Sequence, residues 1–236
     1  KANVLNEQQQ ELIDEFREDF LREEYKTYLL HGITGSGKTE VYLAAIEEVV
    51  KKGKQAIVLI PEIALTYQTV TRFTKRFGDR VSILNSRLSK GEKYDQWLRA
   101  KRGDIDVIIG PRSALFTPFS NLGLIIIDEE QEGAYNSEQI PRYHTRETAE
   151  KLAQMTNSLL LLGSATPSIE AFSRAESGEY RKFCLTKRAV LGSCLPNVQV
   201  VDMRKELASG NRSVFSRELR EKMEECLAKK QQMMRL

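Results

Sequence analysis

The sequence has 236 residues, 41% hydrophobic and 29% charged, with a mean hydropathy of −0.42 and a net charge of +3. These values are typical of one large α/β domain or two small ones, and they exclude an intrinsically disordered chain. The apolar runs are too short to cross a bilayer and no signal peptide is evident, so we expect a cytoplasmic protein without a membrane partner.

Two groups of residues are interpreted as having no part in the function. Cys184, Cys194 and Cys226 are widely spaced and odd in number, which predicts neither a disulfide framework nor a zinc motif. A basic cluster is interpreted as a solvated helix face, because such clusters alone are weak evidence for nucleic-acid binding. Its members are Arg72, Lys75, Arg76 and Arg80.

Apolar periodicity alternates between helix and strand over residues 1–178. The first helix covers about residues 12–20, with Asn6 as its N-cap. The expected strands are residues 28–31, 56–60, 81–84, 105–109, 122–127 and 159–162. The later helices are expected over residues 38–51, 64–76, 91–102 and 147–155 and from about 167, with Gly53 and Gly78 as stops. This order predicts a mainly parallel sheet with helices on both faces.

The pattern changes from about residue 179. Residues 181–185 and 198–201 are expected as edge strands, joined by a loop. Residues 213–236 are interpreted as a linker and an amphipathic helix that ends without a C-terminal signal, which indicates a truncation.

The glycine-rich segment after the first strand fits the phosphate-loop pattern G-x-x-x-x-G-K-[ST]. It consists of Gly32, Ile33, Thr34, Gly35, Ser36, Gly37, Lys38 and Thr39. Its backbone N–H groups and the helix that follows it favour a phosphate anion. Lys38 is expected on the β- and γ-phosphates of ATP, and Thr39 is expected to give Mg²⁺ a hydroxyl ligand. The alternative is a simple turn, but the strand before it and the helix after it favour a phosphate loop.

Two carboxylates follow the strand at residues 122–127 directly. Asp128 is expected to hold Mg²⁺ through its water shell, and Glu129 to orient or deprotonate the attacking water. The alternative is an acidic turn or helix cap. Ser164 and Thr166 follow the next strand, where their hydroxyls can bond to the acidic turn. All these residues lie at the carboxyl ends of strands, where parallel sheets bind ligands.

The motifs occur in an order that resembles superfamily-2 helicases. Motifs I, Ia, Ib, II and III match residues 32–39, 61–66, 110–114, 128–131 and 163–166. Residues 5–9 resemble the glutamine motif, in which Gln9 would read the adenine edge. The stretches GITGSGKTEVY, LIPEIALT, GPRSALFTPF, IIIDEEQEGAY, PRYHTRE and LLGSATPSIE are similar to the primosomal replication-restart helicases (primosomal protein N-prime, PriA).

The resemblance covers nearly the whole chain and implies a RecA-like P-loop NTPase lobe that uses ATP and Mg²⁺. It implies the motor lobe of a 3′-to-5′ DNA helicase in primosome assembly and the restart of stalled forks. The implied partners are forked and single-stranded DNA, primosome proteins and single-strand-binding proteins. Residues 1–178 would form the first lobe, 179–212 would finish it, and 213–236 would be a linker helix and the start of a second lobe.

The resemblance also implies DNA contacts. Arg112 and Ser113 of motif Ib would touch the DNA backbone, with a helix-packing salt bridge of Arg112 as the alternative. An aromatic-rich loop past the acidic residues would link DNA to the ATP site, through stacking on bases and arginine–phosphate contacts. Its residues are Tyr135, Arg142, Tyr143, His144 and Arg146. The alternative is a surface loop packed by its own aromatic side chains.

Two residues depart from the family pattern. Gln131 stands where the family commonly has histidine, and Pro111 where it more often has threonine. Because glutamine donates and accepts hydrogen bonds, we expect Gln131 still to couple motif II to Ser164 and Thr166, although it cannot gain a charge.

The resemblance places the arginine finger and the zinc-binding cysteines in a second lobe. We therefore expect the isolated chain to bind nucleotide weakly, to hydrolyse it poorly and not to unwind DNA. The alternatives to a helicase are a nucleotide-switched binding module, or another P-loop NTPase such as a nucleotide kinase. Glu129 argues against a pure switch, and no arginine-bearing lid for a kinase is evident.

Overall fold

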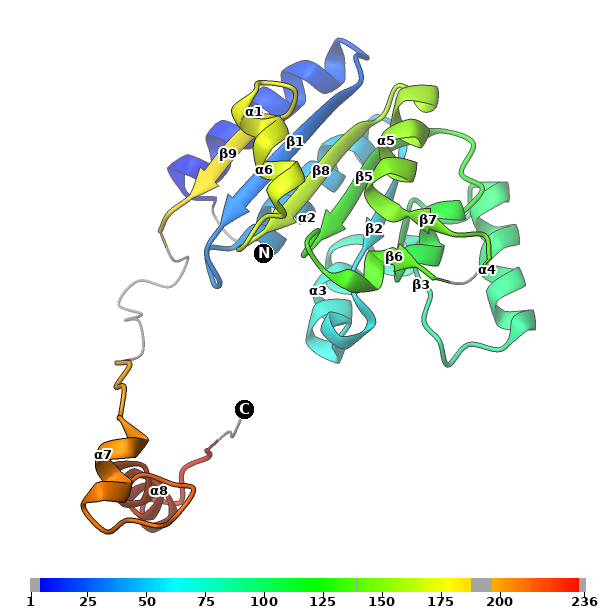
Figure 1. Cartoon of the computed structure of the whole chain (residues 1–236). Coiled ribbons are helices and arrows are strands. Elements are labelled where there is room, and N and C mark those ends of the chain that lie inside the picture. The colour runs from blue at the N-terminus through cyan, green and yellow to red at the C-terminus, as the bar shows by residue number, and fades with distance from the viewer. Residues whose placement is uncertain (1–4, 139, 188–196, 234–236) are drawn as a thin grey trace. The chain divides into compact units, whose positions relative to one another are not determined.

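The computed structural model describes residues 5–138, 140–187 and 197–233, and the chain divides into two compact units, residues 1–191 and 192–236. The first unit contains a seven-stranded sheet in the order β3-β4-β2-β5-β8-β1-β9, and every neighbouring pair is parallel (Figure 1). The strands are β1 Lys26–Gly32, β2 Gln55–Leu59, β3 Val81–Ile83, β4 Val107–Gly110, β5 Leu122–Asp128, β8 Leu159–Ser164 and β9 Arg181–Leu185. The predicted parallel α/β fold is confirmed.

Helices cover both faces of this sheet (Figure 1). On one face lie α1 Glu7–Leu21, α2 Lys38–Lys51 and α3 Tyr67–Phe77, and on the other α4 Lys90–Arg102, α5 Thr145–Thr156 and α6 Ile169–Glu176. Side chains alternate between the faces along each central strand, because successive residues of a strand point to opposite sides. In β2, Ala56 and Val58 pack against the first set of helices, and Ile57 and Leu59 against the second.

The helix boundaries follow local capping. Asn6 accepts from the backbone N–H of Gln9, and the Gln9 side chain accepts from the backbone N–H of Asn6, which completes a capping box at α1. Helix α3 begins later than predicted, because a 3-10 turn, η1 (Glu62–Ala64), precedes it and Thr66 caps it. It ends at Gly78, as predicted.

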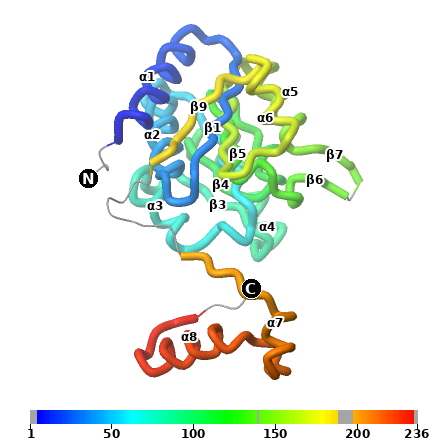
Figure 2. Tube along the Cα trace, turned by 60° about the vertical axis from the view of Figure 1, so that its left-hand side comes forward, coloured from blue at the N-terminus to red at the C-terminus, as the bar shows by residue number. Residues whose placement is uncertain are grey.

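Three segments differ from the sequence prediction. Residues 198–201 form no strand, and the Val198 and Val200 side chains are 80% and 92% exposed, so their alternation does not reflect burial in a sheet. The short helix α7 (Met203–Ala208) was not predicted. The antiparallel pair β6 (Asn136–Ser137) and β7 (Tyr143–His144) was not predicted either. We call this pair the β6–β7 ribbon, and Figure 2 shows it projecting from the first unit.

The second unit contains α7 and α8 (Arg217–Ala228). Glu206 of α7 accepts from the backbone N–H of Arg217 at 3.0 Å and from the Asn211 amide at 2.7 Å, so the connection between the two helices is hydrogen-bonded. None of the helices in the described part of the chain is long and apolar enough to span a membrane. Cys184 and Cys226 are free thiols, whereas Cys194 lies outside the described residues.

Candidate nucleotide-binding site

The phosphate loop connects the end of β1 to the start of α2. Gly35 and Gly37 have φ angles of 80° and 86°, in the left-handed region that glycine adopts without steric cost. Gly37 is the N-cap of α2 and no side chain caps this helix end, so its first N–H groups remain available to an anion. The Lys38 ammonium donates to the carbonyl of Gly32 at 2.9 Å, which folds the lysine back over the loop.

The acidic residues lie at the end of β5, beside this loop. Glu129 has a φ of 49°, a conformation that costs a non-glycine residue about 1–3 kcal/mol and that turns the chain sharply after the strand. The Glu129 carboxylate lies 3.9 Å from the ammonium of Lys38. Burial and the charge of Glu129 raise the pKa of Asp128, although a hydrogen bond from Tyr42 opposes them.

One cavity of 440 Å³ brings the two motifs together. It is lined by Ile33, Thr34, Gly35, Ser36, Gly37, Lys38, Thr39, Glu40, Arg72, Asp128 and Glu129. The sheet order explains this meeting, because β8 alone separates β1 from β5 and all three strands end at the same edge. The predicted phosphate loop and acidic pair therefore form a single site.

The donor set at this cavity fits magnesium. Thr39 and Asp128 line the same cavity and carry a hydroxyl and a carboxylate, and Mg²⁺ prefers oxygen ligands while keeping several waters. Within the described stretches, no group of three His, Cys, Asp or Glu residues could hold a metal ion, so a metal here would rely on water and phosphate oxygens. The buried Ser36 hydroxyl has no hydrogen-bond partner among the described residues, so it is free to bond to a group bound in this cavity.

Gln131 joins the acidic turn to the end of β8. Its amide nitrogen donates to Glu129 at 3.0 Å, and its amide oxygen accepts from the hydroxyl of Ser164 at 2.5 Å. The backbone N–H of Thr166 donates to that same hydroxyl at 2.9 Å, whereas the Thr166 side chain is exposed. The glutamine thus makes the contact expected between motif II and motif III, and it makes it through Ser164.

Gln9 contacts the phosphate loop in this structure. Its side chain is buried, and its amide nitrogen donates to the carbonyls of Ser36 at 3.1 Å and Gly37 at 3.4 Å. Since its amide oxygen belongs to the capping box, Gln9 supports the loop backbone. Recognition of adenine by Gln9 stays a prediction.

Arg72 is a site residue that the sequence analysis missed. It was assigned to a solvated helix face, yet it lines the nucleotide cavity. Two other basic residues of that cluster form ion pairs, the partly buried Arg76 with Glu47 at 2.8 Å and the exposed Arg80 with Asp106. The sequence could have indicated that Arg72 lies near the site. Helix α3 begins soon after β2, so its first turns lie near the edge of the sheet where the strands end.

The comparisons with known proteins agree with this geometry. The sequence model described as DEAD/DEAH box helicase matches residues 6–174. The chain belongs to the DEAD/DEAH box helicase family. It is 51% identical over 228 residues to the replication restart protein PriA of Bacillus subtilis, covering 97% of this chain and 28% of that protein. It is 44% identical over 210 residues to PriA of Haemophilus influenzae, covering 89% and 28%. The resemblance to replication-restart helicases is confirmed, and the chain spans about a quarter of the length of these curated relatives.

Solved structures show the same fold. RecG bound to a three-way DNA junction matches with a TM-score of 0.60 and 26% identity, over 81% of this chain and 25% of that one. A DEAD box protein from Methanococcus jannaschii matches with a TM-score of 0.53 and 20% identity, over 77% and 49%, and supports the fold alone. The RecA-like helicase lobe predicted from sequence is therefore confirmed.

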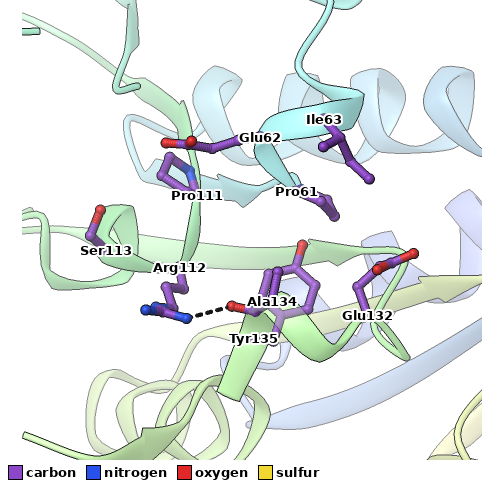
Figure 3. A pocket seen from close by; sticks show the side chains of 9 residues that line it. All are labelled: Pro61, Glu62, Ile63, Pro111, Arg112, Ser113, Glu132, Ala134 and Tyr135. Carbon is purple, nitrogen blue, oxygen red and sulfur yellow. Dashed lines mark hydrogen bonds between the residues drawn. The ribbon is translucent and has the colours of Figure 1, made fainter. Parts of the chain in front are cut away.

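A second cavity of this helicase-family lobe lies beside motifs Ia and Ib (Figure 3). Three segments line it, residues 61–63, 111–113 and residues 132, 134 and 135. Arg112 donates through Nη1 to the carbonyls of Ala134 and Asn136, each at 2.8 Å, and it forms no salt bridge with the described residues. Its contact with the DNA backbone stays a prediction. Ser113 is exposed at the cavity, and its contact with DNA stays a prediction.

Tyr135 is not a surface base-stacking residue, which corrects part of the loop prediction. Its side chain is 2% exposed, and its hydroxyl donates to the carbonyls of Asp128 at 2.7 Å and Leu59 at 3.1 Å. Burial raises the pKa of its phenol. The side chain is thus covered by protein, and its hydroxyl connects the loop to the backbone of motif II directly.

The remaining loop residues divide between surface and interior. Arg142 is exposed, and Tyr143 is half-buried with its ring edge-on to Phe116 at 5.2 Å between centroids. The buried Nδ1 of His144 has no partner in the described part of the chain. Arg146, predicted to meet phosphate, is 5% exposed and pairs with Glu130 at 3.3 Å, so that prediction is wrong.

Proposed function

We propose that this chain is the ATP-binding motor lobe of a 3′-to-5′ DNA helicase that acts in the restart of stalled replication forks. One observation carries the proposal: a single cavity holds the phosphate loop and Asp128 with Glu129, and Gln131 connects it to motif III. The similarity to replication restart proteins supports the pathway.

The chemistry follows from the side chains at the cavity. Lys38, which now contacts Gly32 and lies near Glu129, would place its charge on the β- and γ-phosphates of ATP. Glu129, oriented by the amide of Gln131, would hold the attacking water and accept its proton. Thr39 and Asp128 would hold Mg²⁺, which neutralises charge on phosphate oxygens when it is bound.

The second cavity and the β6–β7 ribbon beside it are proposed to face DNA. Arg142 and Ser113 are exposed there and Tyr143 is half-buried, and Tyr135 connects the segment to the backbone of Asp128. Aromatic rings stack on unpaired bases for about 1–3 kcal/mol each, so Tyr143→Ala in the intact protein should reduce DNA-stimulated hydrolysis and leave DNA-free hydrolysis unchanged. Tyr94→Ala, which removes an exposed tyrosine of α4, is the matched control. Equal stimulation in Tyr143→Ala and wild type would refute the assignment.

The whole proposal is tested by ATP hydrolysis of the intact protein with forked DNA, with single-stranded DNA and without DNA. We expect DNA to stimulate hydrolysis, and Lys38→Ala to abolish it under all three conditions. A hydrolysis rate that does not change with DNA would favour another P-loop NTPase. Nucleotide binding without hydrolysis would favour a nucleotide-switched binding module. Primosome and single-strand-binding partners, zinc in a second lobe and a cytoplasmic location stay predictions from the resemblance.

A further inference from the structure

Tyr42 brings a buried phenol to the acidic site. It lies on α2, three residues after Thr39 and thus on the same side of the helix. Its side chain is 1% exposed, and its hydroxyl donates to Oδ1 of Asp128 at 2.7 Å. Neither the phosphate-loop pattern nor the acidic motif contains this residue.

Gly163 makes the room for that phenol. It pairs with Asp128 in the parallel register of β5 and β8. A Cβ at this position would lie 1.7 Å from the Tyr42 hydroxyl oxygen and 2.8 Å from its ring carbon Cζ. Any side chain at residue 163 would therefore displace the phenol, so α2, β5 and β8 together define where Tyr42 meets the carboxylate.

We propose that Tyr42 is a positioning residue for the magnesium of the nucleotide, acting through Asp128. This inference rests on the proposed function. The terminal torsion of an aspartate is soft, and a buried hydroxyl on one oxygen fixes the plane in which the other oxygen is presented. Magnesium demands near-ideal octahedral geometry, so a freely rotating carboxylate holds its water shell less well. Partners that orient metal ligands typically contribute about 10–100-fold in metal affinity.

The test is Tyr42→Phe in the intact protein, which removes one oxygen atom and keeps the ring. Binding of a fluorescent ATP analogue is measured in EDTA and over a series of Mg²⁺ concentrations. We expect the affinity in EDTA to be unchanged and the Mg²⁺ concentration for half of the metal-dependent gain to rise about tenfold. Tyr28→Phe is the matched control, because Tyr28 is also fully buried and also donates to an aspartate, Asp19, outside the site.

A second variant keeps the test decisive if Tyr42→Phe alone perturbs folding. Gly163→Ala should raise the Mg²⁺ requirement as well, because its Cβ would displace the Tyr42 hydroxyl, and the unfolding midpoints of both single variants are measured beside the Mg²⁺ series. An unchanged Mg²⁺ requirement in both single variants overturns the inference and leaves the proposed function standing. Absence of Mg²⁺-dependent nucleotide binding by the wild-type protein overturns the proposed function and this inference with it.

Discussion

Arg146 provides a direct test of how the lobe holds its acidic motif. Its guanidinium donates to Glu130 at 3.3 Å and to the hydroxyl of Ser168 at 2.8 Å, and the side chains of Arg146 and Glu130 are 6% and 0% exposed. Glu130 also accepts from the backbone N–H of Ser168 at 2.6 Å. The three residues thus form a buried network that joins motif II, α5 and the start of α6.

Removing one partner of a buried ion pair typically costs about 3–5 kcal/mol, because the other charge stays buried without compensation. In Arg146→Ala, both bonds from Ser168 to Glu130 survive, so we expect the lower end, about 3 kcal/mol. Urea unfolding followed by circular dichroism measures the change. Arg142→Ala, at an exposed arginine that precedes α5, should leave the unfolding midpoint unchanged. A wild-type midpoint for Arg146→Ala, together with weaker DNA binding, would refute this account and restore the phosphate-contact interpretation.

Two further predictions concern the site, and a third concerns the ion pair of Arg17 and Glu48 between α1 and α2. Gln131→Ala and Ser164→Ala should be non-additive in DNA-stimulated hydrolysis, with a coupling of about 0.5–3 kcal/mol, and full additivity would contradict their contact. Arg72→Ala should raise the KM for ATP about tenfold, equivalent to about 1.4 kcal/mol, with Arg72→Lys intermediate; an unchanged KM would return the residue to the solvated face. The hydrogen bond from Arg17 lowers the pKa of Glu48 below its ordinary value of 4.5. The stabilisation of the folded state by this pair is therefore fully present above pH 4.5 and is lost as the pH falls through the lowered pKa. Thermal unfolding should show a smaller loss on acidification in Glu48→Gln than in wild type, and identical acid profiles would contradict this.

Sequence predicted the features that depend on local signals. Asn6 as a cap, Gly78 as a stop and the glycine pattern of the phosphate loop report backbone conformation directly, so they were correct. The meeting of Asp128 with that loop followed from the rule that parallel strands end at one edge.

The errors concern side chains whose partners are distant in sequence. Arg146 looked like a surface arginine, although its spacing with Ala149 and Ala153 places it on the buried side of α5 and could have indicated its burial. Tyr135 contacts the backbone carbonyls of Asp128 and Leu59, which no side-chain pattern reports. The apolar alternation at residues 198–201 resembled that of a strand, but these residues do not pair with any strand in the described part of the chain.

A crystal structure of the chain grown with Mg²⁺ and a non-hydrolysable ATP analogue tests the central claim most directly. We expect the triphosphate at residues 32–39, with its γ-phosphate toward Asp128 and Glu129 and the metal between Thr39 and Asp128. Nucleotide bound elsewhere on the lobe, or bound at the loop with the acidic pair turned away from the phosphates, would contradict it.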